Sequence, residues 1–168
     1  MAHAVVLALF DDAMAASAGA RELRALGVAP ERVSIVARSH DEEGVIARAS
    51  GASPGSELED SQPASRLGEL SAHLLAAIAL VMPGIGPIVA DGPLAAGLGE
   101  AAGHLAGGIA RALEGAGLPR ADAQQWEEEI RGGAFLVGGH VEPGAVEGAR
   151  HVLTRAGGRQ VAVGMWPD

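Results

Sequence analysis

The chain has 168 residues, enough for one domain with a sizeable core, and a net charge of -9. Cysteine is absent, which excludes disulfides, thiolate zinc sites, iron–sulfur ligation and a cysteine nucleophile. The acidic balance argues against nucleic acid as a partner. Because hydrophobic residues make up 48% of the chain and aromatic residues only 2%, we expect a core of small aliphatic side chains.

The first forty residues predict a strand, a helix and a second strand. Residues 5–10 form an apolar run rich in strand formers, and two aspartates after it supply N-cap chemistry for a helix over about 13–26. Gly27 has the position of a left-handed residue that ends this helix, and residues 33–37 alternate like a strand. The N-terminus does not resemble a signal peptide, so we expect a cytoplasmic location.

The middle of the chain predicts a polar connection and then a helical hairpin. Residues 39–65 are polar and rich in turn formers, whereas no formally charged residue occurs over 70–90. We expect one helix over about 64–81, a proline- and glycine-rich turn, and a returning helix over about 93–113. These segments predict an inserted Gly/Ala-rich helical hairpin over 66–118.

The returning helix carries a stripe of glycines that is suited to close packing. Gly99, Gly103 and Gly107 recur at intervals of four, which lets another backbone approach one face of a helix. A lone two-helix hairpin would leave this apolar surface uncovered. We therefore expect the hairpin to associate with another copy of the chain, as a homodimer or a higher oligomer.

Two Glu/His pairs occur in this otherwise apolar hairpin. Glu69 precedes His73 by four residues, and Glu100 precedes His104 by four. One interpretation is an intrahelical contact of about 0.2–0.5 kcal/mol in each pair. The other interpretation is a site that binds a transition metal or haem, because folding the hairpin would bring the two histidines to nearly the same level.

A further short helix follows the hairpin. Pro119 is placed to open it and residues 119–131 contain it. Three consecutive glutamates, Glu127 to Glu129, are more typical of a solvated helix face than of a metal site.

The end of the chain repeats the plan of its beginning. Residues 135–141 read as a strand, Pro143 fits the first turn of a helix that ends at Gly157, and residues 161–165 read as a strand. Two βαβ units predict an α+β fold with a ferredoxin-like split βαβ sheet, both helices covering one face. We expect a single domain over 1–168, whose ferredoxin-like core comes from residues 4–38 and 133–166.

The order of these segments resembles a known family. Together with the turn Pro83-Gly84-Ile85-Gly86-Pro87, the run Gly92 to Ala96 and Arg131-Gly132-Gly133 before a strand, it is similar to the bacterial general-stress-protein-like (heat-induced stress protein) family. The resemblance covers nearly the whole chain and implies an association with stress. The hairpin of that family looks like a nearly uniform Gly/Ala zipper that could associate with membranes. The ionisable residues of this hairpin argue against full insertion into lipid.

The sequence shows no recognisable catalytic motif and no spacing typical of a catalytic triad. The leading hypothesis is a non-enzymatic, stress-associated oligomeric protein whose glycine-zipper hairpin mediates self-association. One alternative is a metal- or haem-binding protein that uses the Glu/His pairs. The other is a peripheral membrane-associated stress protein.

Overall fold

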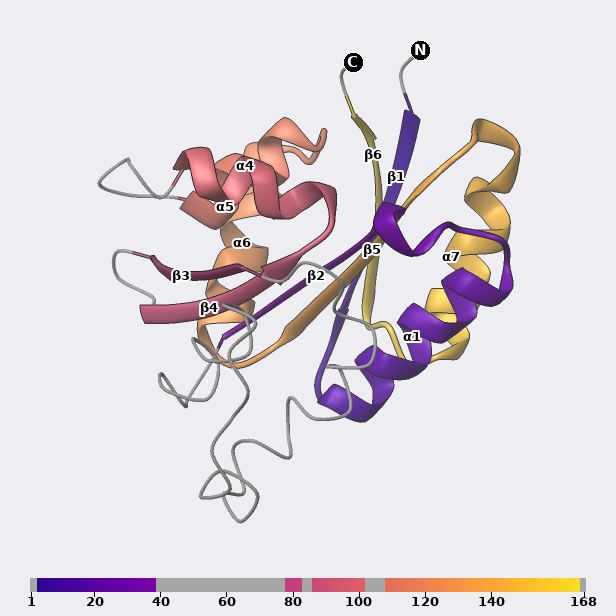
Figure 1. The fold of residues 1–168 in the computed structure, drawn as a ribbon, viewed down its shortest axis with the longest axis horizontal. Coiled ribbons are helices and arrows are strands. Elements are labelled where there is room, and N and C mark those ends of the chain that lie inside the picture. Colours follow the sequence, from indigo (N-terminus) through magenta and orange to yellow (C-terminus); the bar gives the residue numbers. More distant parts are fainter. Residues whose placement is uncertain (1–2, 39–77, 83–85, 102–107, 167–168) are drawn as a thin grey trace.

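The computed structural model describes residues 3–38, 78–82, 86–101 and 108–166, with side chains for all of these except 78–82, 86–87 and 99–101. A sheet lies between two groups of helices (Figure 1). The strands are β1 (His3–Phe10), β2 (Val33–Arg38), β3 (Ile78–Met82), β4 (Gly86–Asp91), β5 (Phe135–Val141) and β6 (Gln160–Trp166). The helices are α1 (Ala13–Ala25), α4 (Pro93–Ala101), α5 (Gly108–Gly115), α6 (Arg120–Arg131) and α7 (Val146–Arg155), with short 3-10 turns η1 (Pro30–Arg32) and η3 (Pro143–Ala145).

The sheet joins the two outer segments of the chain. Its order is β3-β4-β2-β5-β1-β6, and every neighbouring pair is antiparallel. The strands β1 and β2 are separated by β5, while β5 and β6 are separated by β1. The prediction that the first and last βαβ segments share one antiparallel sheet is therefore confirmed, and the fold is a mixed α and β arrangement.

One face of the sheet packs against α1 and α7. Along β1, Ala4, Val6 and Ala8 point to this face, where they join Leu23 of α1 and Leu153 of α7 in one buried cluster. The alternation follows from the pleat of a strand, which sends successive side chains to opposite faces. The two outer helices therefore cover the same face of the sheet, as the sequence predicted.

The other face is covered by α4, α5 and α6. Val5, Leu7 and Leu9 of β1 point here and form a second buried cluster with Leu98 of α4 and Trp126 of α6. In Figure 1 these three helices lie on the opposite side of the sheet from α1 and α7. The middle of the chain thus supplies the cover of the second face.

The first helix predicted for the hairpin is wrong at its C-terminal end. Residues 78–82 form the strand β3, which pairs with β4, and β4 pairs with β2. Residues 64–77 lie outside the described residues. A short uncharged apolar run cannot be assigned to helix or strand by periodicity alone, and here the free edge of β2 supplies hydrogen-bonding partners for another antiparallel strand.

The returning helix begins at Pro93 as predicted, but a single straight helix over 93–113 is wrong. A side chain added at Gly97 in α4 would lie 3.7 Å from Cβ of Ala112 in α5. In one straight helix those two positions would be about 22 Å apart, at 1.5 Å per residue. The helices α4 and α5 instead pack beside each other, where glycine and alanine allow close approach.

The connection from β4 to α4 requires glycine. Gly92 has a φ of +78°, and its amide donates to Asp91 Oδ1 at 2.7 Å. The first turn of α4 is anchored to the sheet, because the amide of Leu94 donates a hydrogen bond to Ser34 Oγ of β2 at 3.2 Å. A Cβ at Gly92 would collide with the carbonyl oxygen of Val33, so this position has neither the backbone geometry nor the space for a side chain.

We predict that Gly92→Ala destabilises the protein by about 1–3 kcal/mol more than Gly27→Ala does. Both substitutions place alanine in the left-handed region, which costs about 1–2 kcal/mol in each case. Only Gly92 adds a clash with the backbone, because no atom of the described residues beyond the chain neighbours of Gly27 lies within 4 Å of a Cβ there. Urea denaturation of the two variants and the wild type measures the difference, and equal losses would contradict the close approach.

Candidate functional site

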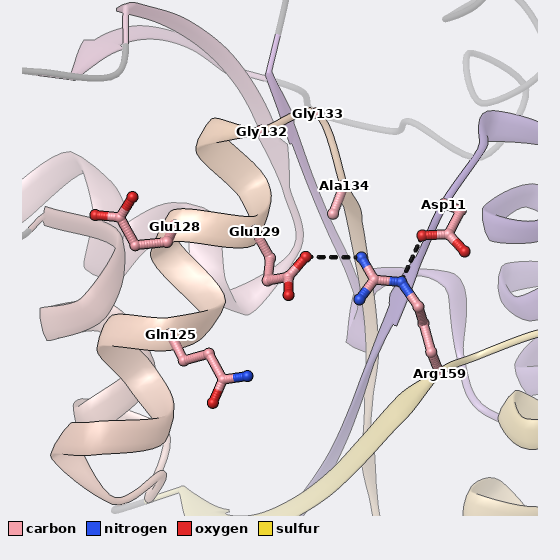
Figure 2. Close-up of a pocket in the computed structure, with 8 residues that line it drawn as sticks. All are labelled: Asp11, Gln125, Glu128, Glu129, Gly132, Gly133, Ala134 and Arg159. Carbon is pink, nitrogen blue, oxygen red and sulfur yellow. Dashed lines mark hydrogen bonds and ion pairs between the residues drawn. The ribbon is translucent and has the colours of Figure 1, made fainter.

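A pocket of about 420 Å³ lies where the end of β1, the end of α6 and the start of β6 meet. Figure 2 shows Arg159 between two carboxylates in this pocket. Its Nη2 donates to Glu129 Oε2 at 2.9 Å, and its Nε donates to Asp11 Oδ1. The remaining residues that line the pocket are Gln125, Glu128, Gly132, Gly133 and Ala134.

The arginine in this pocket is held as a cation by its partners. The hydrogen bond to Glu129 raises the pKa of Arg159, the bond to Asp11 acts in the same direction, and desolvation opposes both. Glu128 points away from the arginine in Figure 2 and pairs with Arg131 instead. The eight lining residues include no hydroxyl nucleophile and no imidazole. The arrangement is therefore suited to joining three segments of the chain through charge-assisted hydrogen bonds.

Glu127 has a structural role that corrects one sequence interpretation. Its Oε2 accepts a hydrogen bond of 2.8 Å from the amide of Ala110 in the first turn of α5, and the residue is 9% exposed. Arg131 lies 3.6 Å from its other oxygen. The prediction of a solvated face over Glu127 to Glu129 is thus wrong for Glu127, which caps a neighbouring helix.

A histidine is buried at the far end of β5. His140 is 6% exposed, and its Nε2 has no hydrogen-bond partner in the described part of the chain. Its ring packs edge-on against Trp166 of β6, with ring centroids 4.8 Å apart and planes at 63°. Near this end, Glu142 accepts a hydrogen bond of 3.5 Å from Arg32 and lies 3.8 Å from His3 Nδ1.

The surroundings of His140 keep its imidazole neutral at physiological pH. Burial lowers the pKa of His140 to about 4, and electrostatic interactions with His3 and Arg32 act in the same direction. A neutral imidazole can ligate a metal ion. Among the residues that the structure describes, however, no three histidine, aspartate or glutamate side chains are placed to hold one.

The predicted metal or haem site falls outside the described parts of the structure. Glu69, His73 and His104 are not among the described residues, and Glu100 belongs to α4 without a described side chain. Binding of a transition metal or haem by them stays a prediction.

The predicted glycine interface is only partly within the described residues. Gly99 lies in α4, whereas Gly103 and Gly107 fall in the gap between α4 and α5. One turn before Gly99, Ala95 is buried in the core against the sheet. The face of α4 that carries Ala95 therefore packs against the core of the same chain. The role of the three glycines in an interface stays a prediction.

The strand β6 forms one edge of the sheet and carries exposed apolar side chains. It pairs with β1 on one side, and no described strand pairs with its other side. Val163 is 41% exposed and Met165 is 55% exposed, and both point to the face that α1 and α7 cover. None of the seven residues of β6 is charged.

Comparisons with models of protein families, with curated proteins and with solved structures found no match for this chain. None of the helices within the described ranges combines the length and the apolar character that a membrane crossing requires.

We predict that the protein loses up to about 3 kcal/mol of stability through His140 as the pH falls from about 6.5 to about 4. In this window the unfolded chain binds a proton at this imidazole and the folded chain does not. The free energy of unfolding is therefore not reduced through His140 above pH 6.5, and it decreases as the pH falls towards 4. His140→Phe keeps a ring against Trp166 and should flatten this part of the profile, measured by urea denaturation at each pH.

The matched control is His151→Gln, because His151 is exposed on α7. This variant should keep the slope of the wild type between pH 6.5 and pH 4. Equal slopes for His140→Phe and the wild type would contradict a buried neutral imidazole at position 140.

We also predict that Glu127→Ala destabilises the protein by about 1–3 kcal/mol, because it leaves the buried amide of Ala110 without an acceptor. Glu128→Ala is the control, since the Glu128 side chain is exposed and forms a surface ion pair with Arg131. It should cost less than about 1 kcal/mol. Chemical denaturation measures both, and similar losses would contradict the helix-capping role.

Proposed function

We propose that this chain is a non-enzymatic, self-associating protein and that the open edge of β6 is its association surface. The observation that carries the proposal is an uncharged edge strand with two exposed apolar side chains, Val163 and Met165. Proteins that remain monomeric usually protect such an edge with charged residues, proline or a bulge. The strand β6 contains no charged residue and no proline. Its register with β1 is continuous from Gln160 to Trp166, without a bulge.

A second copy of the same chain is the partner that this edge fits. The chain carries a net charge of -9, so two copies repel each other over most of their surfaces. Along β6 this repulsion has no local source, because its seven residues are uncharged. The edge of one antiparallel strand is complementary to the edge of an identical strand turned by two-fold symmetry.

The architecture that presents this edge is, in our proposal, a ferredoxin-like core. The spatial order β2-β5-β1-β6 supports it, with α1 and α7 packed on the same face. In such a core the fourth strand ends the sheet, which agrees with a β6 whose second side has no partner among the described strands. The pair β3 and β4 extends the opposite edge.

The association with stress rests on the resemblance to general stress proteins and is part of the same proposal. A stress-associated protein that acts by self-association needs no catalytic group, only a surface that pairs when its concentration rises. A cytoplasmic location stays a prediction on the same footing.

We predict that the wild type is a dimer or a higher oligomer at micromolar concentration and that Val163→Lys raises its dissociation constant at least about tenfold. Each copy of the variant carries a lysine ammonium group at position 163, which would lie opposite the second ammonium group or opposite an apolar side chain. Like charges directly opposite each other destabilise a sheet. Light scattering coupled to size exclusion, over a series of protein concentrations, measures the change.

Met14→Lys is the matched control, because Met14 is 67% exposed on α1 and receives the same change in charge. It should leave the dissociation constant within about threefold of the wild type. Gly103→Leu tests the glycine stripe as a rival interface, since a bulky residue separates closely packed backbones. A monomeric wild type would overturn the proposed function, and loss of association in Gly103→Leu but not in Val163→Lys would move it to the glycines.

A further inference from the structure

A second pocket, of about 170 Å³, lies where the turn after α1, the turn η1 and the end of β5 meet. Its lining combines aliphatic surface with one cation, Arg32, and one carboxylate, Glu142. The aliphatic residues of the lining are Leu26, Val28, Ala29, Val141 and Ala145. Leu26 is 43% exposed, so a ligand in the pocket can cover apolar surface that the chain itself leaves in water.

The cation and the carboxylate of this pocket form only a long hydrogen bond. Arg32 Nη1 donates to Glu142 Oε1 at 3.5 Å, whereas charge-assisted N–H···O bonds are usually about 2.7–2.9 Å long. His3 Nδ1 lies 3.8 Å from the same oxygen. The guanidinium and the carboxylate are both on exposed side chains, so each keeps bonding capacity for a ligand.

The buried residue His140 also lines this pocket. Its Nε2 is buried without a hydrogen-bond partner in the described part of the chain, and a buried polar atom in that state costs free energy. Because Val33 pairs with Gly139, the residue before Val33 lies beside His140, which brings Arg32 next to this histidine. The imidazole is uncharged at physiological pH, since burial lowers its pKa to about 4.

We propose that this pocket binds a small aliphatic α-amino acid as its zwitterion. Arg32 binds the carboxylate, and Glu142 accepts hydrogen bonds from the ammonium group. His140 donates from Nε2 to the same carboxylate as Arg32, because these two residues are neighbours across the ends of their strands. This inference goes beyond self-association and needs no second copy of the chain.

The charges of the pocket favour a zwitterion over an ion of one sign. The lining contains one cation and one carboxylate, so a simple carboxylate ligand would meet Glu142 and a simple ammonium ligand would meet Arg32. Like charges brought together in this way weaken binding. In an α-amino acid both charged groups are attached to one carbon, which suits a guanidinium and a carboxylate 3.5 Å apart.

The volume of the pocket limits the side chain of the ligand. Sites for drug-sized molecules have about 300–1,000 Å³, so a pocket of about 170 Å³ accepts only a small molecule. Its aliphatic lining suits an alkyl group. We therefore expect valine to bind more tightly than glycine, which has no side chain, and than phenylalanine, which is too large.

Titration of the wild type with L-valine, followed by NMR, tests the site. The ring nitrogens of His140 and the indole of Trp166, whose ring centroids are 4.8 Å apart, should show saturable shifts. The expected dissociation constant is below about 10 mM. Two analogues separate the charges, because isovalerate lacks the ammonium group and isobutylamine lacks the carboxylate. Each should bind at least about tenfold more weakly than valine.

Arg32→Gln should weaken valine binding at least about tenfold, because it removes the cation that holds the carboxylate. Arg150→Gln is the matched control, since Arg150 also pairs with a surface glutamate, Glu147 at 3.3 Å, but does not line the pocket. It should leave the dissociation constant within about twofold of the wild type. His140→Phe keeps a ring beside Trp166 but removes the donor, and it should weaken binding about fivefold.

Amide spectra of each variant establish that it is folded before it is titrated. Saturable binding of valine that Arg32→Gln weakens and Arg150→Gln keeps supports the site. Equal affinities for valine and isovalerate would overturn the zwitterion, since Glu142 would then contribute nothing. An absence of saturable shifts when valine is added to the folded wild type would overturn the site altogether and leave the Nε2 of His140 to a water molecule.

Discussion

The structure depends on its first strand, which is apolar on both of its faces and has a neighbouring strand on each side. From Ala4 to Phe10 every side chain of β1 is buried, with alternate residues belonging to different clusters. A strand of this kind cannot have one face in water, because each fully buried Val or Leu contributes about 1.5–3 kcal/mol that exposure would forfeit. The chain must therefore cover the sheet twice, once with α1 and α7 and once with α4, α5 and α6.

This constraint gives the middle of the chain its role in the fold. The segment between β2 and β5 would be an appendage if the outer βαβ units formed a complete core by themselves. Instead Leu94, Leu98 and Leu113 from that segment are buried against the sheet together with Trp126. Small residues such as Gly97 and Ala112 let the covering helices α4 and α5 approach each other.

The outer units could be predicted from sequence because their signals are local. The run that became β1, the N-cap Asp12 and the left-handed Gly27 and Gly157 lie next to the elements that they define. The run before Asp91 lacks a signal that separates strand from helix, since an uncharged apolar run satisfies a buried strand and a buried helix equally well. There the outcome was decided by the free edge of β2, which is a tertiary feature.

The contacts of the candidate site could not be predicted from neighbouring residues in the sequence either. The carboxylate of Glu127 finds its partner at Ala110 on another helix, and Arg159 finds Asp11 at the other end of the chain. Such pairings join residues 17 and 148 positions apart, so spacing alone does not reveal them. The burial of His140 likewise follows from the packing of Trp166 across the sheet and not from its own neighbours in sequence.

The pairing of β1 with β6 sets the start of one strand beside the end of the other. His3 is the register partner of Trp166, so the start of β1 and the end of β6 lie on the same side of the molecule (Figure 1). A loop of about two to five residues could thus join β6 to β1 as a hairpin, and new ends could be opened between β3 and β4. Such a circular permutation would keep the order of strands in space while turning the longest-range ladder into a local one. It would separate the influence of chain connectivity on folding rate from that of packing on stability.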